Sequence, residues 1–411
     1  MGLRDRVLGV TRTALGIFPD RMLSRALPGA LGWNDATMVT SEVPPAGVRL
    51  LIAPVNSAGQ AYLWARAARE HLVGVEAVNL MTTNAQTERF GFPSDLSIPE
   101  SGYIFARGWQ RRQRRAIIDG FTHMVVESGR HPYGSVPGRT PLDAVHDLTA
   151  SGIALALVWH GSDIRIPSVH ARWEADSPFG ERGHYPPAST ALLERNSRER
   201  RSLISETSLP VFVSTPGLLD VPRATWLPVV VDTDRWRSDQ QPLRESRPTV
   251  AYVPSNSPMK GDPVIDEQLS QLDAEGAIRY VRLEGVPAAE MPGVYRQADI
   301  VLDQFRLGDY GVAACEAMAA GRVVVGHVHD DVRARVVART GLVLPIVESR
   351  YADVDVTIRA ILNDRTTFRD RAAAGVEYVR EVHDGRMSAR VLSDFLGAVP
   401  AAPGAEEDPF V

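Results

Sequence analysis

The sequence predicts an α/β protein with two doubly wound domains, each built on a parallel sheet. Short apolar runs typical of buried strands alternate with helical segments along most of the chain, which indicates parallel strands joined by helices. The chain has 411 residues, too many for one small core, so two domains of ordinary size are expected. The polar stretch 233–248 lacks periodicity and separates the two series of strands. The predicted domains are therefore residues 1–232 and 249–385.

Composition excludes several classes of protein. The formal net charge of -5 argues against general nucleic-acid binding. Cys315 is the only cysteine, so no intrachain disulfide can form, which favours a reducing compartment and a cytoplasmic location. No apolar run reaches the roughly 18 residues that a membrane span needs. Arginines break the apolar stretches near the N-terminus, and no signal-peptide pattern is present.

Two basic segments leave membrane contact open. Within residues 1–45, apolar side chains can share one helical face, with arginines elsewhere. This segment either packs on the first domain or rests on a membrane as an amphipathic helix. The stretch 107–115 carries five arginines around Trp109 and forms either a solvated helix face or a patch for an anionic acceptor or an acidic membrane. The membrane alternatives imply peripheral membrane contact through residues 1–33 or 107–115.

The first domain opens with a strand, a glycine turn and a helix. An apolar run at 48–53 is followed by PVNSAGQ at 54–60, with Gly59 just before a helix expected over 61–70. This order opens a nucleotide-binding type of βα unit, although the loop lacks the GxGxxG fingerprint of dinucleotide sites. Residues 81–104 are expected to be rich in loops, and residues 167–187 to form one long loop. Further strands are expected at 75–80, 122–127, 153–158, 211–214 and 225–231, and a charged helix at 190–206.

Polar residues follow two of these strands, where open α/β sheets place ligands. Glu127 ends the strand at 122–127. The strand at 153–158 runs into WHGSDIR, so His160 lies at its carboxyl end. Asp163 can hold an imidazole or a sugar hydroxyl, and Arg165 can meet a phosphate or pair with Asp163. A structural role for His160 is the alternative.

The second domain repeats the alternation. Its first strand, 249–253, leads into PSNSPMKG, where Lys260 stands just before a helix and adds a positive charge to the helix dipole. The turn Glu284–Pro287 follows the second strand. Other expected elements are a strand at 278–283, a helix at 290–297, a short strand at 341–345, helices at 354–362 and 367–382, a final helix within 386–399, and a disordered tail at 400–411.

The central stretch is 299–326, which contains a strand, a glycine-bordered loop, a helix at 312–320 and a second strand. Glu316 is the only charged residue of that helix. The glycine-bordered loop leaves free backbone N–H groups at the helix N-terminus, which suits a phosphate. A carboxylate just beyond it suits a ribose diol, so the stretch predicts a nucleotide-diphosphate site.

The segment CEAMAAG (315–321), with the valine strand after it, resembles the donor-site motif of glycosyltransferases with the GT-B fold. The retaining family 4 type is nearest, and its motif contains two glutamates separated by seven residues. Glu316 matches the second glutamate, which binds the donor ribose in that family. The first glutamate, which contacts the donor sugar, falls on Gly308 here. Backbone groups of the loop formed by Asp309, Tyr310, Gly311 and Val312, or the Asp309 side chain itself, are the expected substitutes.

The resemblance also implies roles for other loops. Lys260 matches a lysine that neutralises the donor diphosphate, and Asn256 lies in the same loop; the companion arginine falls near Ser257. Arg282, Arg306 or Arg165 would then compensate for the missing charge. The turn that begins at Glu284 would bind the nucleobase, Gly59 would lie against the diphosphate, and His160 would face the reacting sugar. Asn56 and Gln60 are expected either to contact donor or acceptor, or to form a plain turn.

The resemblance implies two Rossmann-like domains that face each other across a cleft. The implied activity moves a sugar from a nucleotide-diphosphate sugar to a small-molecule, glycan or lipid-linked acceptor, with retention of anomeric configuration and without metal or cofactor. His160 and Asp163 would be the catalytic residues. One alternative is a GT-B nucleotide-sugar 2-epimerase, for which Asp163 and Glu127 are the acid/base candidates. Another is a sugar-nucleotide-binding protein with little catalysis, suggested by Gly308 and the missing arginine.

Overall fold

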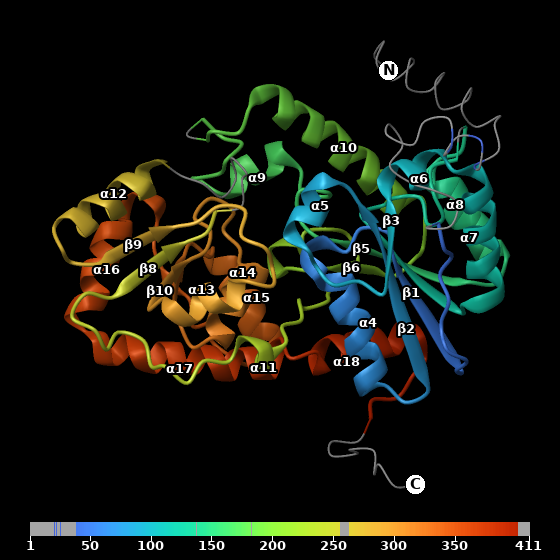
Figure 1. Ribbon diagram of the computed structural model, residues 1–411. Coiled ribbons are helices and arrows are strands. Elements are labelled where there is room, and N and C mark those ends of the chain that lie inside the picture. Colours follow the sequence, from blue (N-terminus) through green and yellow to red (C-terminus); the bar gives the residue numbers. More distant parts are fainter. Residues whose placement is uncertain are drawn as a thin grey trace, which may run out of the picture.

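The computed structural model describes Asp20, Met22, Arg25 and residues 38–136, 138–181, 183–254 and 263–401. Two α/β domains lie side by side, each around its own parallel sheet (Figure 1). Asn256, Lys260, the expected tail from 402 onward and most of the N-terminal segment lie outside the described residues. No helix in the described part of the chain is long and apolar enough to cross a bilayer.

The first sheet has seven strands in the order β3-β2-β1-β4-β5-β6-β7, and all pairings are parallel. Its strands are β1 (Val48–Ala53), β2 (Val75–Thr83), β3 (Leu96–Pro99), β4 (His123–Glu127), β5 (Ala154–Trp159), β6 (Val211–Val213) and β7 (Ala224–Trp226). The chain adds β2 and β3 on one side of β1 and then continues with β4 on the other side, so β1 and β4 are direct neighbours. This is the switch point at which a doubly wound sheet opens a crevice for a ligand.

Alternating side chains of β1 show why this sheet is buried on both faces. Leu50 and Ile52 pack with α4 (Gln60–His71) and α18 (Arg386–Leu396). Leu51 and Ala53 belong to the core on the opposite face, under helices α6 (Glu100–Phe105), α7 (Arg107–Gly120) and α8 (Pro141–Ala150). Residues 50–53, which are covered on both faces, are accordingly all apolar, whereas Arg49 near the start of the strand is half-buried and donates to the Gly120 carbonyl at 2.6 Å.

The second sheet has five parallel strands in the order β12-β11-β10-β8-β9. Its strands are β8 (Thr249–Tyr252), β9 (Arg279–Arg282), β10 (Ile300–Leu302), β11 (Val323–Gly326) and β12 (Val347–Glu348). One face is covered by α13 (Met291–Gln297), α14 (Val312–Ala319), α15 (Asp330–Thr340) and α17 (Arg365–Val382), and the other by α12 (Pro263–Ala274) and α16 (Val354–Asn363). The switch point lies between β8 and β10, so the loops after these strands open toward the first domain.

The last helix belongs structurally to the first domain. α17 packs on the second sheet, and α18 then runs beneath the first sheet along the lower side of the molecule (Figure 1). Leu392 and Leu396 of α18 are buried with Trp64 of α4. His383 lies between the two helices, and its Nδ1 forms a hydrogen bond with the Val229 carbonyl at 2.8 Å. Burial lowers the pKa of His383 to about 4, so this hinge histidine is neutral.

Three expected segments differ from the structure. Residues 81–104, expected to be rich in loops, contain more regular structure: the end of β2, α5 (Ala85–Phe90), β3 and α6. The expected loop 167–187 begins with α9 (Pro167–Trp173), and α10 (Pro187–Ser205) starts at its end. The strand expected at 341–345 is wrong, because Pro345 has no N–H for a sheet ladder, and pairing with β11 begins only at Val347.

The segment around α9 crosses from the first domain to the second (Figure 1). Buried Glu174 accepts from His327 Nε2 at 2.7 Å and from Arg350 at 2.7 Å, both on the second domain. His327 also bonds through Nδ1 to Glu348 at 2.5 Å. Burial opposes its charge, but the two carboxylates outweigh burial and raise the pKa of His327 to about 9. A charged, buried ion cluster therefore joins the domains on the side of the cleft away from α18.

We expect this cluster to make stability depend on pH. Because the folded-state pKa of His327 lies above its unfolded value of 6.5, its contribution is complete below about pH 6.5 and disappears as the pH rises through about 9. The difference in melting temperature between wild type and His327→Gln should therefore be large at pH 6 and shrink toward pH 10. Differential scanning calorimetry of the two proteins across this range measures it.

His146→Gln, at an exposed histidine of α8, is the matched control and should follow wild type at every pH. A wild-type to His327→Gln difference that does not change between pH 6 and pH 10 would contradict a charged His327 in the cluster.

Candidate functional site

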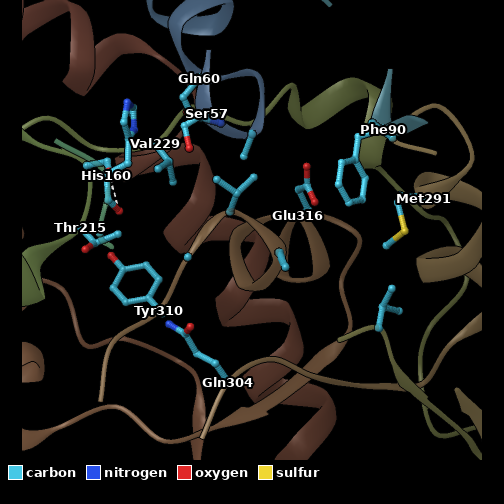
Figure 2. A pocket seen from close by; sticks show the side chains of 18 of the residues that line it. Ser57, Gln60, Phe90, His160, Thr215, Val229, Met291, Gln304, Tyr310 and Glu316 are labelled. Atoms are coloured by element: carbon cyan, nitrogen blue, oxygen red, sulfur yellow. Dashed lines mark hydrogen bonds between the residues drawn. The ribbon is translucent and has the colours of Figure 1, made fainter. Parts of the chain in front are cut away.

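A cavity of about 430 Å³ lies between the carboxyl edges of the two sheets. Both domains line it, and Figure 2 shows His160 and Thr215 at one end, Phe90 and Met291 at the other, and Glu316 between them. The predicted site residues that line it are Gln60, His160, Arg165, Asp309, Tyr310, Gly311, Val312 and Glu316. Predicted site residues from both domains therefore meet at one cavity.

Glu127 supports the wall of this cavity from behind. Its carboxylate is fully buried and accepts hydrogen bonds from the backbone N–H of Val55 at 2.7 Å and of Asn56 at 2.9 Å. Asn56 and Ala58 have positive φ values of 58° and 50°, which cost energy in non-glycine residues. The carboxylate thus stabilises a strained loop after β1, and Ser57 and Ala58 of that loop line the cavity.

The His160 imidazole is held on two sides. Its Nε2 bonds to Glu127 Oε1 at 3.2 Å, and its ring stacks on Trp64 with centroids 5.6 Å apart. Burial opposes a charge on this ring, but the hydrogen bond to Glu127 and the negative charges of Asp163 and Glu127 outweigh it and raise the pKa of His160. The ring therefore presents a fixed, readily protonated face to the cavity.

Asp163 does not hold the imidazole. Its carboxylate accepts from the backbone N–H groups of His160 at 3.0 Å and Gly161 at 2.8 Å, and from Ser128 Oγ at 2.7 Å. It therefore fixes the turn after β5, and Glu127 takes the position next to the imidazole ring. Among the described residues, Asp163 and Glu127 are absent from the cavity lining.

Asp309 connects the two domains at the floor of the cavity. Thr215 Oγ1 of the first domain donates to its Oδ2 at 2.6 Å, and the Tyr310 N–H donates to Oδ1 at 2.9 Å. Arg165 lies 3.7 Å from the same carboxylate and does not pair with Asp163. Burial raises the pKa of Asp309, against the opposing effects of Arg165 and these donors. Arg165 and Asp309 thus place one cation and one carboxylate side by side in the cavity wall.

Glu316 lies on the second turn of α14 and points into the cavity (Figure 2). α14 begins after Gly311 with no side-chain cap and no acidic residue in its first turn. Its first N–H groups therefore face the cavity beside Gly311, Val312 and Ala313, which all line it. A helix N-terminus of this kind attracts an anionic group, and the carboxylate can accept hydroxyl hydrogens.

Gly308 faces away from the cavity. It has a left-handed conformation (φ 60°), and a Cβ placed there would lie 2.8 Å from Glu174 Oε2 and 3.3 Å from Trp173. A side chain at position 308 would therefore meet the α9 segment. The sugar-contacting glutamate of the resembling family has no room at this position, and the next residue, Asp309, faces the cavity.

Other predicted site residues have structural partners. The Asn56 side chain bonds to the Pro93 carbonyl and accepts from Tyr62 N–H, and it does not line the cavity. Gln60 lines it, but its amide pairs with both backbone groups of Val230. Gly59 has a left-handed backbone (φ 76°) and is not among the residues that line the cavity; a Cβ there would be in ordinary contact with the Phe92 ring. Asn56 and Gly59 therefore lie outside the described cavity lining.

The three arginines expected to replace the missing positive charge differ in whether they line the cavity. Arg282 pairs with Glu284 at 2.7 Å on the surface, and Glu284 itself is not part of the lining, although Gly285 is. Arg306 lies over the Tyr351 ring, 3.9 Å from its centroid. Arg165 is the one of the three that lines the cavity.

Several lining residues were not predicted from the sequence. Phe90 and Phe92 come from the segment expected to be a loop, and no pattern marks them. Thr215 follows β6 at the carboxyl edge of the sheet, so the position rule that selected His160 also applies to it. Trp236, Met291 and Gln304 are three more of the unpredicted lining residues. Within the described ranges, no group of three or more His, Cys, Asp or Glu side chains is placed to hold a metal ion.

Comparisons with known proteins identify the fold. No protein-family model and no curated protein sequence matches the chain significantly. HepE from Anabaena, solved with UDP and glucose, aligns over 85% of this chain and 99% of its own, with 12% identity and a TM-score of 0.53. The HepE complex with UDP-glucose gives 11% identity over 85% and 99%, also at 0.53. A glycosyltransferase from Rickettsia africae aligns over 86% and 98%, with 10% identity and a TM-score of 0.52.

At such identities, the similarity establishes architecture. Almost the whole length of these proteins is matched. The chain therefore has the GT-B fold, as its donor-site motif led us to expect.

We expect Glu127→Gln to lower the pKa of His160. The glutamine keeps an acceptor at Oε1 but removes the negative charge that stabilises the imidazolium. NMR titration of the His160 ring resonances measures the shift. Glu127→Ala should in addition lower the free energy of unfolding by about 1–3 kcal/mol, because buried N–H groups lose their acceptor.

Glu100→Gln, at a partly exposed glutamate of the same domain, should leave the His160 titration unchanged. If Glu127→Gln also leaves it unchanged, the hydrogen bond to Glu127 does not set the protonation of His160.

We expect Gly308→Glu to destabilise the protein without improving nucleotide binding. The left-handed backbone and the nearby Glu174 carboxylate make the change unfavourable by about 1–3 kcal/mol. Urea unfolding measures the loss, and Gly308→Ala should show part of it. A stable Gly308→Glu variant with tighter nucleotide binding would contradict the outward orientation of this position.

Proposed function

We propose that this protein is a glycosyltransferase that moves a sugar from a nucleoside-diphosphate sugar to an acceptor. The observation that carries the proposal is the position of Glu316, which points into the interdomain cavity just beyond the uncapped N-terminus of α14. A diphosphate at that N-terminus would place the ribose hydroxyls within reach of the carboxylate. The GT-B fold and the CEAMAAG segment are consistent with this arrangement.

Charge development on the leaving diphosphate needs stabilisation from groups that are already in place. The N–H groups of α14 supply a fixed dipole, and Arg165 supplies a buried cation at the same end of the cavity. The His160 ring, with its raised pKa, adds a second positive charge below that pKa. These groups act from both domains, so the site is complete only when the domains are together.

Uridine diphosphate is the first donor nucleotide to test, because HepE, which shares the fold, has been solved with UDP and with UDP-glucose. Retention of anomeric configuration, independence of metal and cofactor, and a cytoplasmic location belong to the proposal on the basis of the family 4 resemblance and the single cysteine. The acceptor class stays open among small molecules, glycans and lipid-linked molecules, and so does membrane contact through residues 107–115. NMR of the product would identify its anomeric configuration.

The epimerase alternative receives no support from the geometry. Its acid/base candidates, Asp163 and Glu127, both satisfy backbone N–H groups behind the cavity wall. A proton transfer would require a carboxylate within hydrogen-bond reach of the sugar. Turnover that depends on an added acceptor separates a transferase from both an epimerase and a protein that only binds nucleotides.

A thermal-shift screen of UDP, GDP, ADP and dTDP tests the donor site. We expect one of them to raise the melting temperature of the wild type. A ligand at a hundredfold excess over its dissociation constant adds about 2.7 kcal/mol of stability. Glu316→Ala should lose most of this response, because the ribose hydroxyls lose their acceptor.

Glu267→Ala is the matched control, since this exposed glutamate lies on α12 of the same domain and is not part of the described cavity lining. It should respond like wild type. If no nucleotide stabilises a folded wild type, the donor-site argument fails and the transferase proposal fails with it.

A further inference from the structure

The N-terminal domain extends a short segment onto the second domain beside the cavity. α5 (Ala85–Phe90) begins at Asn84, whose side chain accepts from the Gln86 and Thr87 N–H groups. The helix ends at Gly91 in a left-handed turn. Local capping at both ends therefore specifies this one-and-a-half-turn helix at the carboxyl edge of the first sheet.

The contact of this segment with the second domain is specific. The Phe90 carbonyl accepts from the Ala288 N–H at 2.8 Å, and Arg235 donates to the Ala288 carbonyl at 2.8 Å. Gly285 has a left-handed backbone (φ 64°), and a Cβ there would overlap the guanidinium of Arg89, which would have to move aside. α5 is thus seated on the turn 284–288, the turn that follows β9.

Two aromatic rings enter the cavity at this contact. Phe90 and Phe92 have ring centroids 6.0 Å apart and line the cavity together with Gly285, Val286 and Met291. Both phenylalanines are only half-buried, so they offer apolar surface to a ligand. In Figure 2 the Phe90 ring and Met291 lie beyond Glu316, on the side opposite His160.

The direction of a bound nucleotide follows from the groups at each end. Arg165 and the α14 N-terminus attract the diphosphate, and Glu316 suits the ribose. The base must then extend away from His160, toward Phe90 and Met291. Apolar side chains and backbone groups line that end, so a planar base would be held by ring contact and by backbone hydrogen bonds.

We propose that Phe90 of the N-terminal domain contacts the base of the bound nucleotide, so that base recognition needs both domains. This inference rests on the proposed function, because it assumes a nucleotide in the cavity. The turn 284–288 alone would hold the edge of the base. The Phe90 ring adds a contact that forms only while α5 is seated on that turn, which couples base binding to the closed arrangement of the domains.

The test is isothermal titration calorimetry of wild type and Phe90→Ala with two probes: UDP, or whichever of the four nucleotides stabilises the wild type, and inorganic pyrophosphate. Ring stacking on a base typically contributes enough for a loss of about 10- to 100-fold in affinity. We expect Phe90→Ala to lose that much affinity for the nucleotide and less than twofold for pyrophosphate. Phe90→Tyr should restore nucleotide binding, and Glu88→Ala, at an exposed position of α5, should match wild type.

Three results would overturn the inference, and they are distinguishable. Unchanged nucleotide affinity in Phe90→Ala means that the ring does not contact the base. Equal losses for nucleotide and pyrophosphate mean that Phe90 only supports the closed arrangement. A wild type that binds pyrophosphate but no nucleotide, or neither probe, overturns the proposed function itself and this inference with it.

Discussion

The buried carboxylate of Asp309 is the interaction on which the geometry of the cleft depends. It belongs to the second domain, yet Thr215 of the first domain supplies one of its donors. A Cβ at Gly217 would lie 2.3 Å from its Oδ2, so the backbone of the first domain approaches it closely. A buried carboxylate is costly unless donors surround it, and here the donors come from both sheets. This requirement fixes the distance between the α14 N-terminus and the loop that carries His160 and Arg165.

The contacts between the domains differ in kind on the two sides of the cleft. On the hinge side, α18 is buried in an apolar core with α4, and exposing these apolar side chains to water would be unfavourable. On the other side, the crossings are the Glu174 ion cluster near α9, the backbone bond between Phe90 and Ala288, and the Trp173 ring against His329, so polar groups take a larger part there. Polar contacts exchange for water at small net cost. This asymmetry favours opening about the hinge at α17 and α18, with α5 and α9 separating from the second domain.

The sequence predicted what is encoded locally. The buried central residues of β1, β4, β5 and β10 are apolar because both faces are covered, and Glu316 stands out as the only charge on its helix. Residues whose role depends on distant partners were not predictable. Glu174 is buried and pairs with His327 of the other domain, 153 positions later in the sequence. Phe90 reaches the cavity from a short helix with no apolar periodicity. Composition and period carry no information about such pairings.

In the loop before α14, the carboxylate that lines the cavity lies one position after the one that the family motif indicates. The spacing of the resembling family points to residue 308, and a glycine there suggests that a carboxylate is simply missing. The left-handed conformation of Gly308 turns position 308 toward the α9 segment and places the following side chain, Asp309, in the cavity. The helix itself keeps its position, since Glu316 still points into the cavity. The cavity lining therefore includes two carboxylates, Asp309 and Glu316, and Asp309 lies next to Arg165.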